Sequence, residues 1–165
     1  MKAILRLLSL FLMLQAPAFA GGSSASPYIG IHVQGEEYEG SKFVVPNQVN
    51  GKTVYFRVSP DVVTRHFESF HAFVSEDAAS FGAALKLNAE GLRAMELMCT
   101  VSRGQLARTI VNGRALDVLR IDHAPADGYF IIWSGLKHED IKLFSKKLKR
   151  LDSGLPGEED TKKRR

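Results

Sequence analysis

The chain has 165 residues, a formal net charge of +4, a hydrophobic fraction of 45% and a single cysteine. So mild a charge does not point to nucleic acid or to a membrane surface as a partner, and we expect neither. One cysteine excludes an internal disulfide, so packing must stabilise the fold, and the helical pattern around Cys99 predicts a buried thiol.

The N-terminal residues predict a secretory signal peptide. Lys2 and Arg6 form a basic segment, an apolar run covers 7–14, and Ala18-Phe19-Ala20 is a small-x-small cleavage site. The apolar run is far shorter than the ~20 residues that a spanning helix needs. We therefore expect cleavage after Ala20, a periplasmic or secreted protein, and no membrane insertion after cleavage. Cleavage would lower the formal net charge to +2.

The segment that follows, residues 21–58, is predicted to be rich in β-structure. Alternating apolar residues predict a strand over 28–33. Phe43-Val44-Val45 predicts a second strand, placed at a sheet edge because a proline follows it. Asn50-Gly51 is a turn signal and precedes a third predicted strand over 53–58.

A helix is the main element predicted between residues 59 and 104. Ser59-Pro60-Asp61 first predicts a short helical start, with serine as N-cap and proline at the first helical position. Strands are expected over 70–74 and 81–87. Asn88 then predicts the N-cap of the longer helix, which Gly104 ends. Its predicted core-facing stripe consists of Ala94, Leu97, Met98 and Val101.

A β-hairpin over 106–121 is the strongest local prediction. Asn112-Gly113 favours a type I′ turn, because both central residues of that turn need a positive φ. A two-residue loop also sets the register. The expected cross-strand pairs are Val111 with Arg114, Thr109 with Leu116, and Arg108 with Asp117, the last of which places opposite charges face to face.

The C-terminal part predicts one strand and one helix. A loop over 122–128 leads to the strand 129–133, which is apolar at every position and is therefore expected to be covered on both faces. A helix is predicted over 137–151. Residues 152–165 are too polar to pack against a core, so we expect them to form a disordered tail. The apolar face of the helix consists of Ile141, Phe144, Leu148 and Leu151.

Together these elements predict an α+β domain, with a largely antiparallel sheet and two main helices packed on one face. The expected organisation is a signal peptide over 1–20, a β-rich N-terminal segment over 21–58, the α+β domain over 59–151 and the polar tail over 152–165.

The second half of the chain resembles the extracytoplasmic head of SecD, the membrane subunit that assists protein export. The resemblance covers 59–151 and rests on the pattern Leu87-x-x-x-Gly91 and on a C-terminal amphipathic helix that begins with acids. It also rests on the spacing of Gly104, Gly113, Gly128, Ile131 and Gly135. The resemblance implies the fold of that head and a non-enzymatic interaction role outside the membrane.

Three departures from the SecD pattern narrow what the resemblance implies. The family usually has Asp-Gly where this chain has Asn112-Gly113, and it has a Ser-Ala-Pro stretch that is absent around 119–123. The sequence also has no counterpart of the transmembrane helices that couple the family to the translocon. The resemblance therefore does not imply proton-driven translocation by this chain.

No motif predicts catalysis, a cofactor or a metal centre. His66 and His71 are five residues apart, not at the i, i+4 spacing of a helical zinc pair. Glu68 lies between them, but a metal site needs three or four ligands that converge in space. Trp133-Ser134-Gly135 is not a nucleophile elbow, and there is no glycine-rich phosphate loop. We therefore expect no enzyme activity, no cofactor and no bound metal.

Another polypeptide is the partner that the hairpin favours. If the hairpin edge is open, it accepts an extended peptide by strand addition, and Arg108, Arg114 and Arg120 are the candidate peptide-binding residues. The alternative is that these charges only protect the edge. We predict a non-enzymatic extracytoplasmic binding or accessory domain that contacts polypeptide clients, as in protein export.

Two other functions stay open at this point. The first is an envelope scaffold that acts through oligomerisation. The second is a small secreted hydrolase, in which a fold brings His66 or His123 beside a hydroxyl or a carboxylate.

Overall fold

The structure, a computed structural model, describes residues 26–76 and 78–151, so the predicted signal peptide and polar tail lie outside the described residues. The helices are α1 (Ala89–Val101), α2 (His138–Phe144) and the 3-10 turns η1 (Glu37–Glu39) and η2 (Thr64–His66). The strands are β1 (Ile29–Gly35), β2 (Val44–Val49), β3 (Lys52–Arg57), β4 (Val62–Val63), β5 (Phe67–Val74), β6 (Phe81–Leu87), β7 (Leu106–Val111), β8 (Arg114–Arg120), β9 (Tyr129–Leu136) and β10 (Lys149–Arg150).

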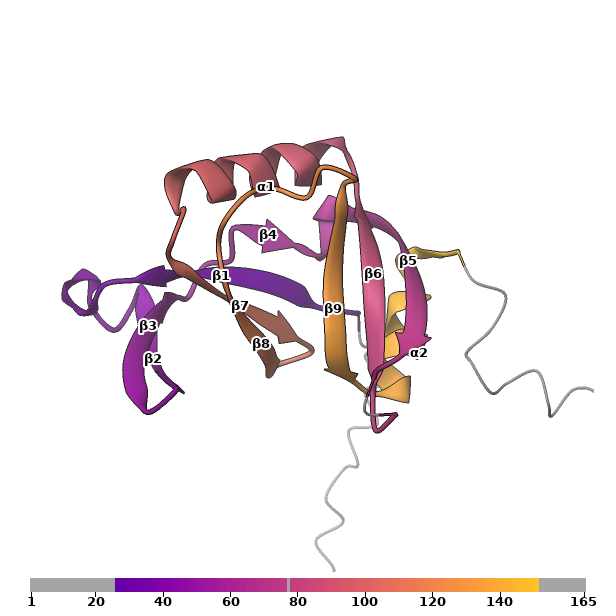
Figure 1. Ribbon diagram of the computed structural model, residues 1–165, viewed down its shortest axis with the longest axis horizontal. Helices are drawn as coiled ribbons and strands as arrows, with labels where there is room; N and C mark the ends of the chain where they lie inside the picture. Colours follow the sequence, from indigo (N-terminus) through magenta and orange to yellow (C-terminus); the bar gives the residue numbers. More distant parts are fainter. Residues whose placement is uncertain (1–25, 77, 152–165) are drawn as a thin grey trace, which may run out of the picture.

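The strands form two sheets (Figure 1). The larger sheet has the order β2-β3-β1-β7-β8, with β4 also paired to β1, and the smaller has the order β10-β5-β6-β9. All described pairings are antiparallel except β10 with β5. The α+β class with largely antiparallel strands is confirmed.

Strand β1 joins the N-terminal segment to the central hairpin. Its residues pair with β7 from Ile29 opposite Val111 to Val33 opposite Ala107. Further along, Gln34 and Gly35 pair with β3 instead. The N-terminal strands therefore share a sheet with the predicted hairpin.

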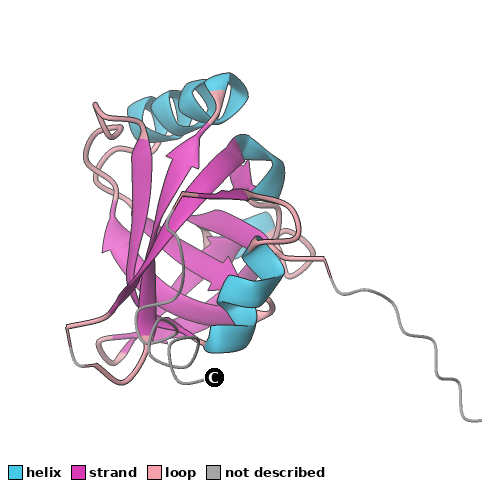
Figure 2. Ribbon diagram, turned by 90° about the vertical axis from the view of Figure 1, so that its right-hand side faces the viewer, coloured by secondary structure: helices cyan, strands magenta, loops and turns pink. Residues whose placement is uncertain are grey.

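Both helices contribute to one continuous core between the sheets. The ring of Phe144 on α2 lies edge-on to Phe70 of β5, with centroids 5.7 Å apart, and both rings are fully buried. Met95 and Met98 of α1 belong to the same core cluster. In Figure 2 the helices lie along the top and the right-hand side, whereas none of the described helices covers the left-hand side of the sheets.

Helix α1 presents a different face to the core from the one predicted. Asn88 is its N-cap as expected, because the side chain accepts a hydrogen bond from the Gly91 N–H at 2.8 Å. However, Leu97 and Val101 are 65% and 70% exposed. Met98 of the predicted stripe is buried and Ala94 packs against the core, but Gly91, Met95 and Cys99 take the inward places expected of Leu97 and Val101. The buried thiol is therefore confirmed, whereas the stripe was wrong at Leu97 and Val101.

A close contact with η2 explains the rotation of α1. A Cβ on Gly91 would lie 2.2 Å from the carbonyl oxygen of His66. The helix can approach this carbonyl only where it has no side chain, so the contact turns Gly91 inward. Met95, one turn later, then faces the core, and Leu97 faces outward.

The central hairpin has the predicted turn but not the predicted register. Asn112 and Gly113 both have positive φ, and Val111 pairs with Arg114. The register then shifts, so that Thr109 faces Asp117 and Arg108 faces Val118. The two other predicted pairs are therefore wrong. The extra residue of this bulge is Leu116, which packs against the core.

The predicted helical start at Ser59-Pro60-Asp61 is wrong, because this segment is a non-helical bend that leads into β4 beside β1. The Asp61 N–H donates to the Ile31 carbonyl at 2.9 Å, and β4 then pairs with β1 through Val62 and Val63. Main-chain pairing with a neighbouring strand outweighs the local capping signal here.

The C-terminal helix is shorter than predicted. Ile141, Phe144 and Leu148 are buried as expected, but α2 ends at Phe144 and Leu151 is 49% exposed. The chain leaves the helix because the edge of β5 offers main-chain partners: β10 pairs with it in parallel, and the Leu151 N–H donates to the Phe70 carbonyl at 2.9 Å.

Strand β9 is covered on one face only, which corrects the prediction of two covered faces. Phe130 and Ile132 are buried, whereas Trp133 is 65% exposed.

None of the described helices is long and apolar enough to cross a membrane.

Candidate functional site between two sheet edges

The candidate site is a groove between β8 and β9. Each of these strands forms the outer edge of its sheet in the described structure, β8 in the larger and β9 in the smaller. A hollow of about 320 Å³ separates them. Its walls are formed by Leu119, Arg120, Ile121, Asp122, His123 and Pro125 on one side, Tyr129, Phe130, Ile131 and Trp133 on the other, and Ile31, Met95, Met98 and Cys99 between them.

The β9 side of the groove is an uncharged apolar edge. The strand reads YFIIWSGL over eight residues and contains neither a charged residue nor a proline. Sheet edges in monomeric proteins are usually protected by charge, by proline or by a covering element, and a long apolar edge without these is prone to pair with another strand. This edge therefore has the composition of a docking edge.

The main-chain hydrogen bonds define which groups of β9 are available. The Gly128 carbonyl accepts from the Leu87 N–H of β6, whereas the Tyr129 N–H donates to the Asp127 carboxylate at 3.0 Å. In an antiparallel ladder, successive residues direct their main-chain groups to opposite sides. Ile131 lies two residues after Tyr129, so its N–H and C=O point away from β6 to the free edge.

The β8 side of the groove is charged and exposes a second set of main-chain groups. The Ile121 N–H donates to the Gln105 carbonyl at 2.8 Å, so the same alternation directs the N–H and C=O of Arg120 away from β7. The Arg120 side chain is exposed and lines the groove, and it forms no ion pair with any described residue. An extended chain in the groove would meet main-chain partners on both walls.

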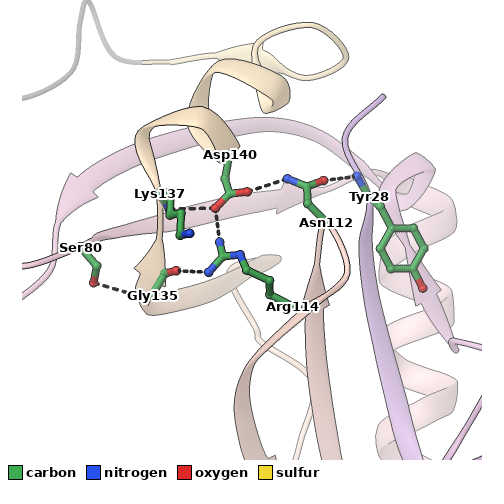
Figure 3. Close-up of polar contacts among 7 residues, drawn as sticks. All are labelled: Tyr28, Ser80, Asn112, Arg114, Gly135, Lys137 and Asp140. Carbon is green, nitrogen blue, oxygen red and sulfur yellow. Dashed lines mark hydrogen bonds and ion pairs between the residues drawn. The ribbon is translucent and has the colours of Figure 1, made fainter. Parts of the chain in front are cut away.

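Arg114 and Asp140 hold the two sheets together at one end of the groove (Figure 3). The Arg114 guanidinium forms an ion pair with the buried Asp140 carboxylate and donates to the Gly135 carbonyl of β9 at 3.2 Å. Asp140 also accepts from the Asn112 side chain at 2.7 Å and from the Lys137 N–H at 2.8 Å. Arg114 is thus a structural clamp.

Asn112 extends this clamp to the start of β1. Its side-chain oxygen accepts from the Tyr28 N–H at 2.9 Å, while its amide group donates to Asp140 (Figure 3). The sequence indicated Asn112 only as a turn residue. In the sequence, Asp140 is only one of the acids at the start of the predicted C-terminal helix, and Lys137 is not a residue type that signals an N-cap.

Arg108 lies away from the groove. It is 8% exposed, and its guanidinium lies over the Phe56 ring at 4.9 Å from the centroid. Burial lowers the pKa of Arg108, and its Nε is buried without a hydrogen-bond partner among residues 26–76 and 78–151. Of the three arginines predicted as a set, the structure places only Arg120 in the groove, with Arg114 at its end and Arg108 in a buried cluster.

His32 is the other titratable group of this buried cluster. Its Nδ1 lies 2.9 Å from the Arg57 carbonyl, which only accepts, so Nδ1 carries the proton and Nε2 accepts from the Tyr28 hydroxyl at 3.1 Å. Burial lowers the pKa of His32, and the charge of Arg108 lowers it further. The hydrogen bond to the Arg57 carbonyl and the charge of Asp61 raise this pKa but do not offset the effect of burial. The imidazole is therefore held in its neutral form.

The remaining candidate histidines do not assemble a catalytic or metal centre in the described residues. His66 is buried, with Nδ1 accepting from the Val63 N–H at 3.2 Å and Nε2 lying 3.5 Å from Glu90. His123 lies 3.1 Å from Asp122 on the surface. Neither imidazole has a hydroxyl partner within residues 26–76 and 78–151, and these residues contain no group of three metal-ligating side chains.

The comparisons with known proteins support the fold. No protein-family model matches the sequence, and no curated protein matches it. The solved structures similar to this chain include SecDF, a membrane component that enhances protein export, at 12% identity and a TM-score of 0.52, covering 75% of this chain. SecDF in its super-membrane-facing form is similar at 13% identity and a TM-score of 0.49, covering 74% of this chain.

The likeness is one of fold, since the sequence identity is very low. This chain spans 64% of the length of the first SecDF chain and 19% of the second. The SecD-like fold expected from the glycine pattern is thus supported by a solved structure. In that pattern, Gly91 has a clear structural role, because it admits the His66 carbonyl against α1.

Proposed function

We propose that this protein is a non-enzymatic extracytoplasmic domain that binds extended polypeptide segments, in an accessory role in protein export. The bound segment lies in the groove and adds as a strand to the free edge of β9. The proposal combines the likeness in fold to SecDF, which enhances protein export, with the properties of the groove.

One observation carries the proposal. An eight-residue uncharged edge strand forms the apolar side of the groove, and its Ile131 main-chain groups have no partner strand on the outer side in the described structure. Strand addition supplies main-chain hydrogen bonds that do not depend on sequence, and apolar pockets add selectivity for alternate side chains. A domain that handles many unfolded clients needs this combination.

The extracytoplasmic location rests on the predicted signal peptide. The basic residues, apolar run and Ala18-Phe19-Ala20 site remain a prediction, because they lie outside the described residues. Sequencing the N-terminus of the exported protein tests it directly: a chain that begins at Gly21 is expected, and an intact Met1 would contradict cleavage.

An NMR titration tests the function. Amide shifts of the protein purified after export are followed while an unfolded secretory polypeptide is added. We expect saturable shifts concentrated on residues 119–123 and 129–133, which line the groove. A spectrum that does not change at about 1 mM polypeptide would contradict the proposed function.

A scaffold that acts through oligomerisation is the second candidate. The exposed side chains of Leu97 and Val101 lie one turn apart on α1 and present an apolar stripe to solvent. Light scattering distinguishes the candidates. A polypeptide-binding domain remains a monomer over a wide concentration range, whereas a scaffold shows a molar mass that rises with concentration and falls when Leu97→Gln is introduced.

A further inference from the structure

Trp133 lies where the groove meets a second hollow on the surface. This single tryptophan of the chain lines the groove between β8 and β9 and also lines an open hollow of about 660 Å³. The second hollow is formed by Phe73, Val74, Ser75, Glu76, Trp133 and Ser134. A strand that follows β9 past Ile131 would therefore reach this hollow, which we call the Trp133 hollow.

Two aromatic rings and Val74 form the apolar part of the Trp133 hollow. The Phe73 and Trp133 rings meet nearly edge-to-face, with centroids 6.4 Å apart and an interplanar angle of 64°. The Phe73 ring packs over Gly82, which has no side chain; a Cβ at this position would lie 2.3 Å from the ring. Trp133 is 65% exposed, so its ring remains accessible to a ligand.

The charge of the Trp133 hollow has one sign. Glu76 is exposed there and forms no ion pair with any described residue, and none of the described side chains that line the hollow is cationic. Exposed aromatic rings beside an unpaired carboxylate attract a cation, because the negative face of a ring and the carboxylate act on the same charge. Strand β9 already holds one cation–ring contact, since Lys86 Nζ lies 4.4 Å from the centroid of the Tyr129 ring.

We infer that the Trp133 hollow binds a lysine or arginine side chain of the polypeptide that adds to β9. The inference rests on the proposed function and deepens it: the preferred client segment combines apolar residues, which enter the groove, with a basic residue next to them. The guanidinium or ammonium group lies against Trp133 and pairs with Glu76, while the main chain pairs with Ile131.

A pair of matched peptides tests the inference. Each has alternating leucine and serine residues, and one carries a single arginine near one end where the other carries citrulline, which has nearly the same shape without the charge. Binding to the protein purified after export is followed by the fluorescence of Trp133, the only tryptophan present. We expect the arginine peptide to bind about five-fold more tightly, as suits an exposed cation–π contact with one ion pair.

A substitution separates the Trp133 hollow from general charge effects. Glu76→Gln is expected to remove most of the preference for arginine and to leave the affinity for the citrulline peptide unchanged. Glu96→Gln, on the exposed side of α1, is the matched control and should preserve the preference.

The outcomes distinguish the two proposals. Equal binding of the arginine and citrulline peptides would overturn the inference while leaving polypeptide binding intact. A preference for arginine that persists in Glu76→Gln would also overturn it, because the cation would then be recognised elsewhere. If neither peptide binds, nor any peptide with the arginine moved to the other end, the proposed function itself fails.

Discussion

The guanidinium of Arg114 on β8 pairs with the buried carboxylate of Asp140 on α2, across the junction of the two sheets. The larger sheet supplies Arg114 and Asn112, and Asp140 follows the edge strand of the smaller sheet. This clamp holds β8 and β9 together at one end (Figure 3) and leaves the rest of the groove between them open.

Removing the charge of Asp140 is expected to destabilise the protein strongly. In Asp140→Asn, the Arg114 guanidinium loses its counter-charge and the Lys137 N–H loses a charged acceptor. Breaking one partner of such a pair should lower the free energy of unfolding by about 2 to 4 kcal/mol. Urea denaturation measures this free energy of unfolding. Arg120→Gln is the control and should change the free energy of unfolding by less than about 0.5 kcal/mol. Equal stability of both variants would contradict the clamp.

Gly91→Ala should destabilise the protein although it improves helix propensity. In an exposed helix this change would stabilise by about 1 kcal/mol. Here the new Cβ would lie 2.2 Å from the His66 carbonyl oxygen, so α1 must move outward. We expect the free energy of unfolding, measured in urea, to fall by about 1 to 3 kcal/mol. A rise in that free energy would show that α1 does not pack on η2 as described.

His32 should make the stability depend on pH. Its pKa in the folded protein is lowered, chiefly by burial, from the value of about 6.5 that it has when unfolded. Above pH ~6.5 both states are neutral; as the pH falls below that value, the unfolded state takes up a proton first, so stability falls until the folded-state pKa is reached.

A substitution at His32 identifies its contribution to the pH dependence. Asparagine can keep the hydrogen bond to the Arg57 carbonyl without titrating, so His32→Asn should flatten the decrease in the free energy of unfolding between pH 7 and pH 5. His123→Asn is the control, because His123 lies on the surface and should leave the decrease unchanged. If the free energy of unfolding of His32→Asn decreases with falling pH as steeply as that of the wild type, other groups cause the pH dependence.

Local signals were sufficient for many elements of the fold. The turn at Asn112-Gly113 needs only two residues with positive φ, and the cap at Asn88 needs only one side chain and a near N–H. The strand over 81–87 was predicted with its observed bounds. The burial of Cys99 followed from the ordinary preference of free thiols, and its pKa is raised by that burial.

The remaining features depend on residues that are distant in the sequence. The rotation of α1 follows from the His66 carbonyl meeting Gly91, and the early end of α2 follows from the free edge of β5. The bulge at Leu116 shifts the hairpin register, which no turn signal encodes. The groove likewise exists only because β8 and β9, which are edges of different sheets, lie opposite one another.

Amide hydrogen exchange of Ile131 shows whether a bound peptide adds as a strand to β9. In the free protein the Ile131 N–H points to the open edge of β9, so it should exchange rapidly, whereas the neighbouring Ile132, paired with Ala83, should be protected. With a saturating arginine-containing peptide, we expect Ile131 to become as protected as Ile132. If Ile131 still exchanges rapidly in the saturated complex, the peptide does not add as a strand to β9, which would contradict the proposed function of the groove.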